Sequence, residues 1–523
     1  MNKRPRRRVF VWVVSALLLS YSLLAVWFVR GVIHGQAPHR PEELLPRPNA
    51  FFQAEASEPT PMKATARQAD ANAQTSETIP PSASSTTGLH VNDDVHVVFS
   101  TGCNLFQHWQ AEVLLHSHLT ISQRGQITRV VSGCDSEHIK RKTAKYLTHP
   151  EGLGDEPVGF EELNRTVHPR SHLHVTPSFE GAREFPWINK PMGLAHWLHN
   201  AARPVTESVI VVIDPDMMFL DTIVQDGSRT LKGKKAPYGD DGLLCTVGCS
   251  KGRVTGKWHG QDVIGWTDKV LEGRPVAQTY GLGGAWVDKF DFKAIAGESS
   301  PSRNLSFSDA SHYYAVGPPM MLHLNDWKKV APLWVKYMRP VYERDPGDIQ
   351  ADMYAYSIAC AHHKLDHLML DNYMISSSGM YGEAWPFVHE QKSFSCKRPL
   401  RSMRYRPTFL HMAHRWDSQV DNFMFHKGHV PPNIFRCDLP ILHEPDDDLI
   451  ARHQSLAKRD VEDMFLLCNA YRQINDALAA WKARFCGGKG NMTEGIMLQK
   501  KHQRCDKKKG LVYGENCWGA FPF

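Results

Sequence analysis

Two carboxylates one residue apart, Asp214 and Asp216, follow the apolar run VIVVI at residues 209–213. Such a run is typical of a buried strand, and α/β proteins bind their ligands at the carboxyl ends of parallel strands. Two carboxylates at such a turn can hold Mg²⁺ or Mn²⁺ and share the ion with a diphosphate. The alternative is a turn whose aspartates bond the backbone or cap a helix. After this buried strand, the pair predicts a metal site.

Strand-like and helix-like stretches alternate in the chain before this pair. The strand-like stretches are residues 94–103, 126–135 and 172–179, and the helix-like stretches are 106–122 and 188–202. This alternation predicts an α/β fold with a mostly parallel sheet that helices cover on both faces. Ser100, Thr101 and Asp135 stand at the ends of the first two strands, where they could meet a nucleotide.

The charge is concentrated at the start of the chain. The formal net charge is +6, and the first eight residues, MNKRPRRR, carry five positive charges, so the remainder is nearly neutral. No nucleic-acid partner is therefore expected. The uncharged residues 9–29 would span about 31 Å as a helix, which predicts a transmembrane signal anchor with a cytosolic basic flank. A cleaved signal peptide is the alternative, and it also places the body in the lumen.

A segment rich in Ala, Ser, Thr, Pro and Gln follows the anchor, at residues 30–93. It lacks the apolar residues needed to offset the entropy of ordering, so it predicts a flexible stem. The chain has eleven cysteines, without the paired spacing of a zinc site. In a lumenal body they predict disulfides of undetermined connectivity, and the odd number leaves at least one thiol unpaired or bridging two chains.

Seven stretches, in order along the chain, resemble one known family. They are HVVFSTGCNLFQHWQ, ITRVVSGCD, FPWINKPMGLAHWL, VIVVIDPDMMFLD, QTYGLGG, MMLHLNDWKKVAPLW and DMYAYSIA. From about residue 95 to about residue 440, the chain resembles the plant and algal peptidyl serine α-galactosyltransferases and, more distantly, the hydroxyproline O-arabinosyltransferases. The resemblance implies a GT-A-like fold and a Golgi-type, metal-dependent, retaining glycosyltransferase that modifies protein hydroxyl groups.

The resemblance also assigns roles to particular residues. It implies that Asp214, Asp216 and His411 hold the metal. It implies that Asn189 and Lys190, in the stretch INKP, meet the diphosphate, with the lysine as a point charge. A helix N-cap asparagine beside a solvated lysine is the alternative for this pair.

Asp352 matches an acidic position of the galactosyltransferases, where it would bond the donor sugar or stabilise positive charge at the anomeric carbon. Asp348 is a second catalytic candidate, since on a helix it would share a face with Asp352. The alternative for both is a solvated helix face. Trp109 and Gln110 also match the family, although a tryptophan in a helix is more typical of the core. Three glycines of YGLGG could let the backbone approach the sugar, or could form a turn; they are Gly281, Gly283 and Gly284.

The expected protein is a single-pass type II enzyme of the Golgi or ER membrane, with a lumenal catalytic domain. The expected segments are a cytosolic tail at 1–8, the anchor at 9–29, the stem at 30–93, the transferase domain at 94–448 and a helical, cysteine-containing extension at 449–523. With Mn²⁺ or another divalent cation, it would transfer galactose from UDP-galactose to serine in hydroxyproline-rich proteins. One alternative is arabinofuranose transfer to hydroxyproline. Another, of a different class, is an inactive anchored protein that binds carbohydrate or nucleotide sugar.

Overall fold

The computed structural model describes residues 95–134, 166–182, 185–231, 243–244, 257–380, 382–389, 396, 406–418, 423–446, 448 and 458–498. The chain divides into two compact units, Met1–Thr86 and Thr87–Phe523, and every described residue lies in the second. The predicted tail, anchor and stem lie outside the described residues. Within the described ranges, no helix is both long and apolar enough to cross a membrane.

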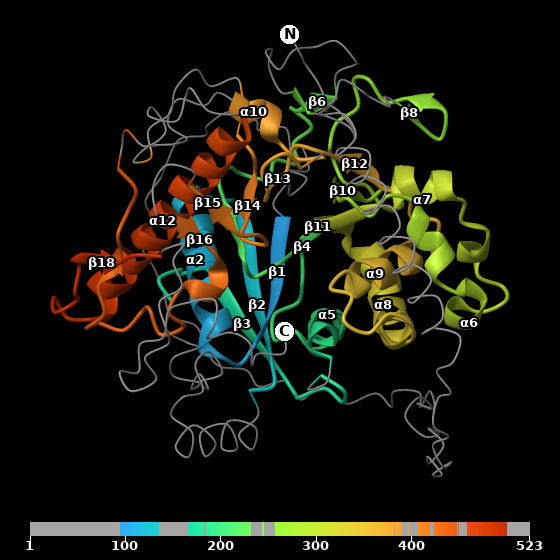
Figure 1. The fold of residues 1–523 in the computed structure, drawn as a ribbon. Helices are drawn as coiled ribbons and strands as arrows, with labels where there is room; N and C mark the ends of the chain where they lie inside the picture. Colours follow the sequence, from blue (N-terminus) through green and yellow to red (C-terminus); the bar gives the residue numbers. More distant parts are fainter. Residues whose placement is uncertain are drawn as a thin grey trace, which may run out of the picture. The chain divides into compact units, whose positions relative to one another are not determined.

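A seven-stranded sheet forms the centre of the second unit (Figure 1). Its order is β12-β10-β11-β4-β1-β2-β3, and every strand except β11 runs in the same direction. The strands are β1 (Val95–Gly102), β2 (Gly125–Ser132), β3 (Ser171–Thr176), β4 (Val209–Ile213), β10 (Val276–Thr279), β11 (Val316–His323) and β12 (Leu368–Leu370). The prediction of an α/β fold with a mostly parallel sheet is therefore confirmed.

The apolar run of β4 is explained by burial on both faces of the sheet. All five of its residues are buried. Val209, Val211 and Ile213 belong to the apolar core on one face, whereas Ile210 and Val212 belong to the core on the other. A strand covered on both faces needs apolar residues without alternation, which is the pattern the sequence has.

Helices cover the two faces of the sheet. On one face lie α5 (Asn189–Asn200), α8 (Leu324–Arg344) and α9 (Ala351–His362), which pack their apolar side chains with Ile210 and Val212 of β4 (Figure 1).

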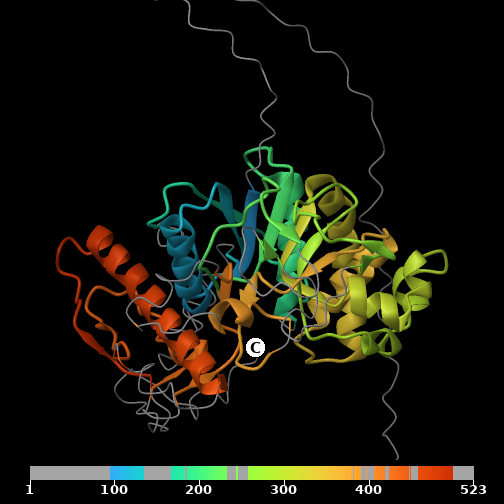
Figure 2. The same cartoon turned by 90° about the horizontal axis from the view of Figure 1, so that it is seen from above.

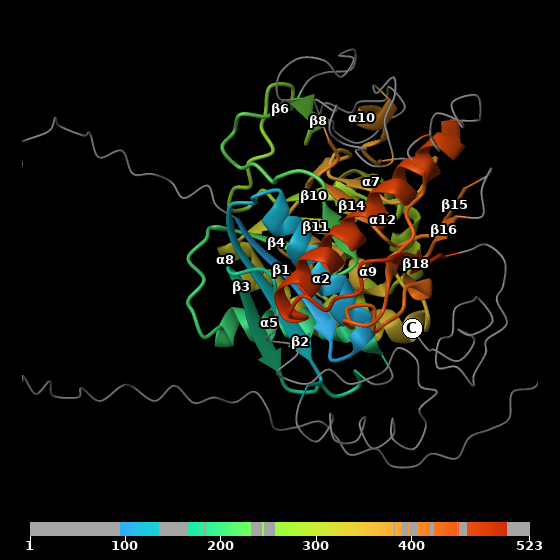
Figure 3. The same ribbon diagram turned by 90° about the vertical axis from the view of Figure 1, so that its left-hand side faces the viewer.

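The other face is covered by α2 (Leu105–Thr120), which places Ala111, Leu114 and Leu115 against the sheet. The long helix α12 (Lys458–Phe485) runs beside α2 on its outer side, as Figures 2 and 3 show. Trp109 and Val113 of α2 share an apolar core with α12.

A small three-stranded sheet brings distant parts of the chain together at the end of β4. Its order is β13-β14-β5. Strand β5 (Met217–Phe219) starts directly after Asp216 and pairs antiparallel with β14 (Phe409–His411). In this register His411 lies opposite Met217, so the pairing carries the histidine to the two aspartates.

The remaining elements are short. The strands are β6 (Thr230–Leu231), β7 (Leu243–Leu244), β8 (Lys257–Trp258), β9 (Gln261–Asp262), β13 (Met374–Ile375), β15 (Trp416–Asp417), β16 (Met424–Phe425), β17 (Ile441–Leu442) and β18 (Glu494–Ile496). The helices are α6 (Phe292–Ala296), α7 (Phe307–Tyr313), α10 (Trp385–His389), η1 (Pro186–Ile188), η3 (Ala285–Lys289), η4 (Pro301–Asn304) and η5 (Lys427–His429).

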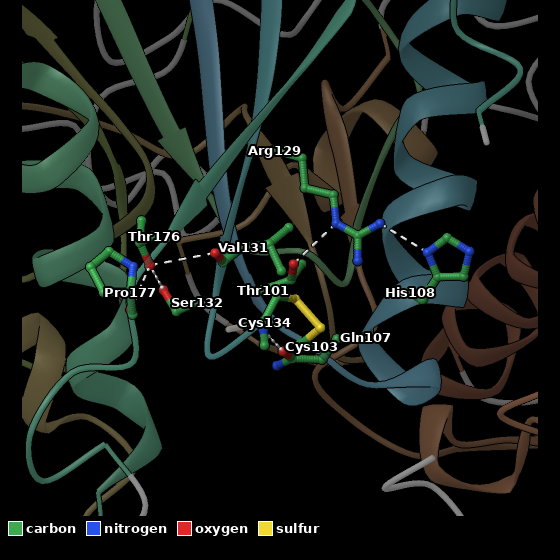
Figure 4. Close-up of a disulfide and its surroundings, with 11 residues drawn as sticks. Thr101, Cys103, Gln107, His108, Arg129, Val131, Ser132, Cys134, Thr176 and Pro177 are labelled. Carbon is green, nitrogen blue, oxygen red and sulfur yellow. Dashed lines mark hydrogen bonds between the residues drawn. A yellow bond between two sulfur atoms is a disulfide. The ribbon is translucent and has the colours of Figure 1, made fainter. Parts of the chain in front are cut away.

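Three disulfides join the described cysteines: Cys103–Cys134, Cys396–Cys468 and Cys437–Cys486. The first connects the segments that follow β1 and β2, at the carboxyl edge of the sheet (Figure 4). Cys360 is buried with a free thiol. The expectation of disulfides is confirmed for these pairs.

Replacing Cys103 and Cys134 together with alanine should destabilise the protein by about 2–4 kcal/mol. The crosslink closes a loop of sequence separation 31 and so limits the conformations of the unfolded chain. Urea unfolding of the variant and the unaltered protein, both without reductant, measures the difference. Equal midpoints with equal slopes would show that this bond contributes nothing to stability.

Candidate metal centre

Asp214, Asp216 and His411 lie together at the carboxyl edge of the sheet. Asp214 is the first residue after β4, Asp216 closes the turn before β5, and His411 ends β14. Ligand atoms of the three side chains lie within 4.8 Å of one another. The three predicted metal ligands therefore form one group, although His411 lies 195 residues after Asp216 in the sequence.

The facing atoms of the group are an imidazole nitrogen and one oxygen of each carboxylate. His411 Nε2 lies 3.2 Å from Asp216 Oδ1 and 3.9 Å from Asp214 Oδ2. The Met412 backbone N–H donates to the Asp216 carbonyl over 2.9 Å, which fixes the two segments to each other. Asp216 and His411 are buried, and Asp214 is partly exposed, so the group is open on the Asp214 side.

Two lysines hold the outward oxygens of the aspartates. Lys190, on α5, lies 2.6 Å from Asp214 Oδ1, and Lys427, on η5, lies 2.5 Å from Asp216 Oδ2. The lysines thus engage one oxygen of each carboxylate and leave the other oxygen turned toward His411. They orient the two carboxylates and offset the repulsion between them.

Lys190 also connects the group to Asp352. Its Nζ lies 2.5 Å from Asp352 Oδ2, and Asp352 is buried in the first turn of α9. Asp352 Oδ1 accepts the Met353 N–H over 2.9 Å. Lys190 therefore joins α5, the end of β4 and the start of α9 through one ammonium group.

The opposite charges in the group favour the ionised forms of Lys190 and Asp216. Burial alone would lower the pKa of Lys190, but the carboxylates of Asp214 and Asp352 outweigh it and raise that pKa above its ordinary value. Burial would raise the pKa of Asp216, but Lys427 and His411 together hold it well below its usual range. Lys190 and Asp216 are therefore both charged at neutral pH.

The other predicted binding residues lie in different places. Ser100 donates its hydroxyl hydrogen to the Asn189 carbonyl over 3.3 Å, so these two residues meet beside Lys190. Thr101 is buried and accepts from Arg129 Nε over 3.0 Å, in the cluster that Figure 4 draws. The described bond of Thr101 is therefore to a buried side chain of β2. Asp135 lies outside the described residues.

Asp348 does not share a helix face with Asp352, so this part of the prediction is wrong. Helix α9 begins at Ala351 with Gln350 as its N-cap, so Asp348 lies before the first turn of the helix. Asp348 instead accepts the Gln350 N–H over 2.9 Å and lies 3.4 Å from Lys289 Nζ.

The tryptophan and glutamine that match the family are internal. Trp109 is fully buried in the core between α2 and α12, as the core interpretation predicted. Gln110 is buried and donates to the Phe106 carbonyl over 2.9 Å.

The glycines of YGLGG belong to a tight turn. Gly283 has a φ of 62°, and a Cβ on Gly284 would lie 2.2 Å from the Phe307 carbonyl oxygen. Gly284 therefore permits a close approach of two backbone segments. A Cβ on Gly281 would meet nothing within 4 Å.

Three residues near the group were missed by sequence reasoning: Lys427, Tyr280 and Glu383. The Tyr280 hydroxyl lies 3.3 Å from His411 Nδ1. Burial raises the pKa of Glu383 to about 7, although hydrogen bonds from Ser376 and Ser377 act to lower it. Tyr280 follows β10 directly, so the strand-end rule that found Asp214 could also have found it.

The donor set suits a divalent cation. Two carboxylate oxygens and one imidazole nitrogen are ligands that Mn²⁺ accepts, and their facing atoms converge on one point. The lysines do not occupy these facing atoms. A metal ion bound to these facing atoms would leave the two lysine salt bridges in place.

The fold and this group define an α/β protein with a candidate metal centre at the carboxyl edge of its sheet. The chain is similar to a protein of Arabidopsis thaliana named peptidyl serine alpha-galactosyltransferase, with 24% identity over 293 residues. The match covers 54% of this chain and 28% of the relative, so the chain matches under a third of that protein's length. No family model matches the chain. The name of this relative is that of the family that the motifs of the sequence resemble.

Proposed function

We propose that this protein is a metal-dependent glycosyltransferase that transfers galactose from UDP-galactose to a serine hydroxyl of a protein acceptor. The observation that carries the proposal is the convergence of Asp214, Asp216 and His411 at the edge of a mostly parallel sheet. The distant relative supports the same class of reaction. A GT-A-like domain and retention of configuration are further parts of this proposal.

The residues of the group have distinct roles in this reaction. Asp214, Asp216 and His411 would hold Mn²⁺ or a similar cation, which would stabilise the charge of the departing diphosphate. An ammonium group has three donors, and Lys190 uses two of them for Asp214 and Asp352. Its third donor, and the free donors of Lys427, are available to phosphate oxygens beside the group.

Asp352 is placed for the sugar end of the donor. It is buried and held by Lys190, and Lys190 also bonds Asp214. A fixed carboxylate at this position would accept a sugar hydroxyl or stabilise the positive charge that develops at the anomeric carbon.

We also propose that residues 9–29 anchor the protein in the Golgi or ER membrane, with the catalytic unit in the lumen. The uncharged run and its basic flank support this placement. An acceptor in a secreted, hydroxyproline-rich protein would pass through the same compartment.

The test is a donor and acceptor screen on the purified full-length protein. UDP-galactose and UDP-arabinofuranose are each supplied with serine-containing or hydroxyproline-containing peptides, with Mn²⁺ or with a chelator. Manganese-dependent transfer of galactose to serine is the expected result. Transfer of arabinofuranose to hydroxyproline alone would overturn the choice of donor and acceptor. Binding of nucleotide sugar without turnover of any donor would instead identify an inactive binding protein.

A further inference from the structure

Tyr280 reaches the metal group from a separate strand. It follows β10, which runs parallel to β4, so Tyr280 and Asp214 lie at the same edge of the sheet. Its hydroxyl lies 3.3 Å from His411 Nδ1 and 3.3 Å from Met374 Sδ. The Tyr280 hydroxyl thus contacts one ring nitrogen of His411, Nδ1, while the other, Nε2, faces the aspartates.

These two contacts define a direction for the hydrogen bonds. A tyrosine hydroxyl has one hydrogen, and a thioether sulfur can only accept it. When the Tyr280 hydroxyl donates to Met374 Sδ, its oxygen is free to accept the hydrogen of His411 Nδ1. A cation at the group would need the lone pair of His411 Nε2, and the one N–H of the neutral imidazole would then be at Nδ1, where the Tyr280 oxygen can accept it. Nε2 is the atom that faces Asp214 and Asp216.

The Tyr280 ring packs directly against Gly317, where any side chain would overlap with it. A Cβ on Gly317, in β11, would lie 2.6 Å from two of the ring carbons of Tyr280. The Tyr280 backbone N–H donates to the Ala315 carbonyl over 2.8 Å, which fixes the start of the side chain. The hydroxyl position is thus set by the pairing of β10 with β11.

Each candidate metal ligand is also bonded by one further side chain, at an atom that does not face the other two ligands. Lys190 holds Asp214, Lys427 holds Asp216, and Tyr280 holds His411. Outer partners of this kind fix the tautomer and the orientation of metal ligands.

We propose that Tyr280 is a positioning residue that holds His411 by its Nδ1 and keeps Nε2 aimed between Asp214 and Asp216, and thereby sets the affinity for the cation. The inference rests on the proposed function, since it needs a metal at this group.

The experiment compares Mn²⁺ binding by the purified full-length protein and by its Tyr280→Phe variant, without donor or acceptor. Free Mn²⁺ is measured by electron paramagnetic resonance during a titration. Phenylalanine keeps the ring but removes the acceptor for His411 Nδ1, so we expect a dissociation constant about 10–100 times larger. Gly317→Ala, which displaces the ring, should weaken binding in the same direction.

Tyr356→Phe is the matched control. It removes another buried tyrosine–histidine hydrogen bond, from the Tyr356 hydroxyl to His367 Nε2 at 2.8 Å, in the same unit of the protein. Its Mn²⁺ affinity should equal that of the unaltered protein. Equal affinities for Tyr280→Phe and the unaltered protein would overturn the role of Tyr280 and leave the proposed function standing. Absence of Mn²⁺ binding by the unaltered protein would overturn both.

Discussion

Replacing Asp214 and Asp216 together with asparagine should abolish Mn²⁺ binding and reduce sugar transfer by on the order of 10³-fold or more. An amide keeps the shape of each side chain but removes the two negative charges that face His411. A metal ion supplies several kcal/mol of stabilisation to a departing diphosphate, and each 1.36 kcal/mol is a factor of ten in rate. Transfer assays and Mn²⁺ titrations on the same preparation measure the two effects.

Asp348→Asn is the control for the metal titration. Asp348 lies outside the metal group and bonds the Gln350 N–H, so its replacement should leave Mn²⁺ affinity unchanged. Circular dichroism of each variant establishes that it is folded. If the double variant is folded and still binds Mn²⁺ with full affinity, the metal lies elsewhere and the proposed centre is wrong.

Replacing Lys190 with methionine should destabilise the folded protein by about 3–5 kcal/mol. Lys190 is the shared partner of Asp214 and Asp352, and the Asp352 side chain is only 4% exposed. Removal of one partner of a buried ion pair leaves an uncompensated charge, whose burial is costly. Urea unfolding at neutral pH measures the loss.

Lys293→Met provides a matched comparison for this substitution. The distance from Lys293 Nζ to Glu298 is 2.6 Å, as short as in the Lys190 pairs, but both side chains are more than 60% exposed. Water screens such a pair, so little change in stability is expected. Adding Asp352→Asn to Lys190→Met should recover part of the lost stability, because a neutral amide is less costly to bury. Equal stabilities of the Lys190 and Lys293 variants would contradict this account.

Much of the scaffold could be predicted because burial leaves a simple pattern in the sequence. Strand β4 is apolar at every position since both of its faces are covered, and the strand-end rule then located Asp214 and Asp216. Helix α5 was predicted at residues 188–202 and is observed at Asn189–Asn200. Such local signals depend only on neighbouring residues.

The rest of the site depends on contacts between distant segments. His411 was reached through the family resemblance, because β14 has three residues and no pattern that sets it apart from a loop. Lys427 follows the two-residue strand β16, and nothing in its surroundings indicates that it contacts Asp216. The predicted pairing of Asp348 with Asp352 on one helix is wrong because Asp348 lies before α9: its side chain accepts the Gln350 N–H, and the helix begins at Ala351.

Helix α12 limits how far the protein can be shortened for expression. Its buried residues, including Leu467 and Trp481, share an apolar core with Trp109 of α2, and the Tyr471 hydroxyl donates to the Met424 carbonyl over 2.8 Å. A truncation near residue 448 would expose this apolar surface to solvent and favour aggregation. It would also release the segment that carries Lys427 three residues after Met424, so fragments intended for crystallisation should extend at least through Cys486, the disulfide partner of Cys437.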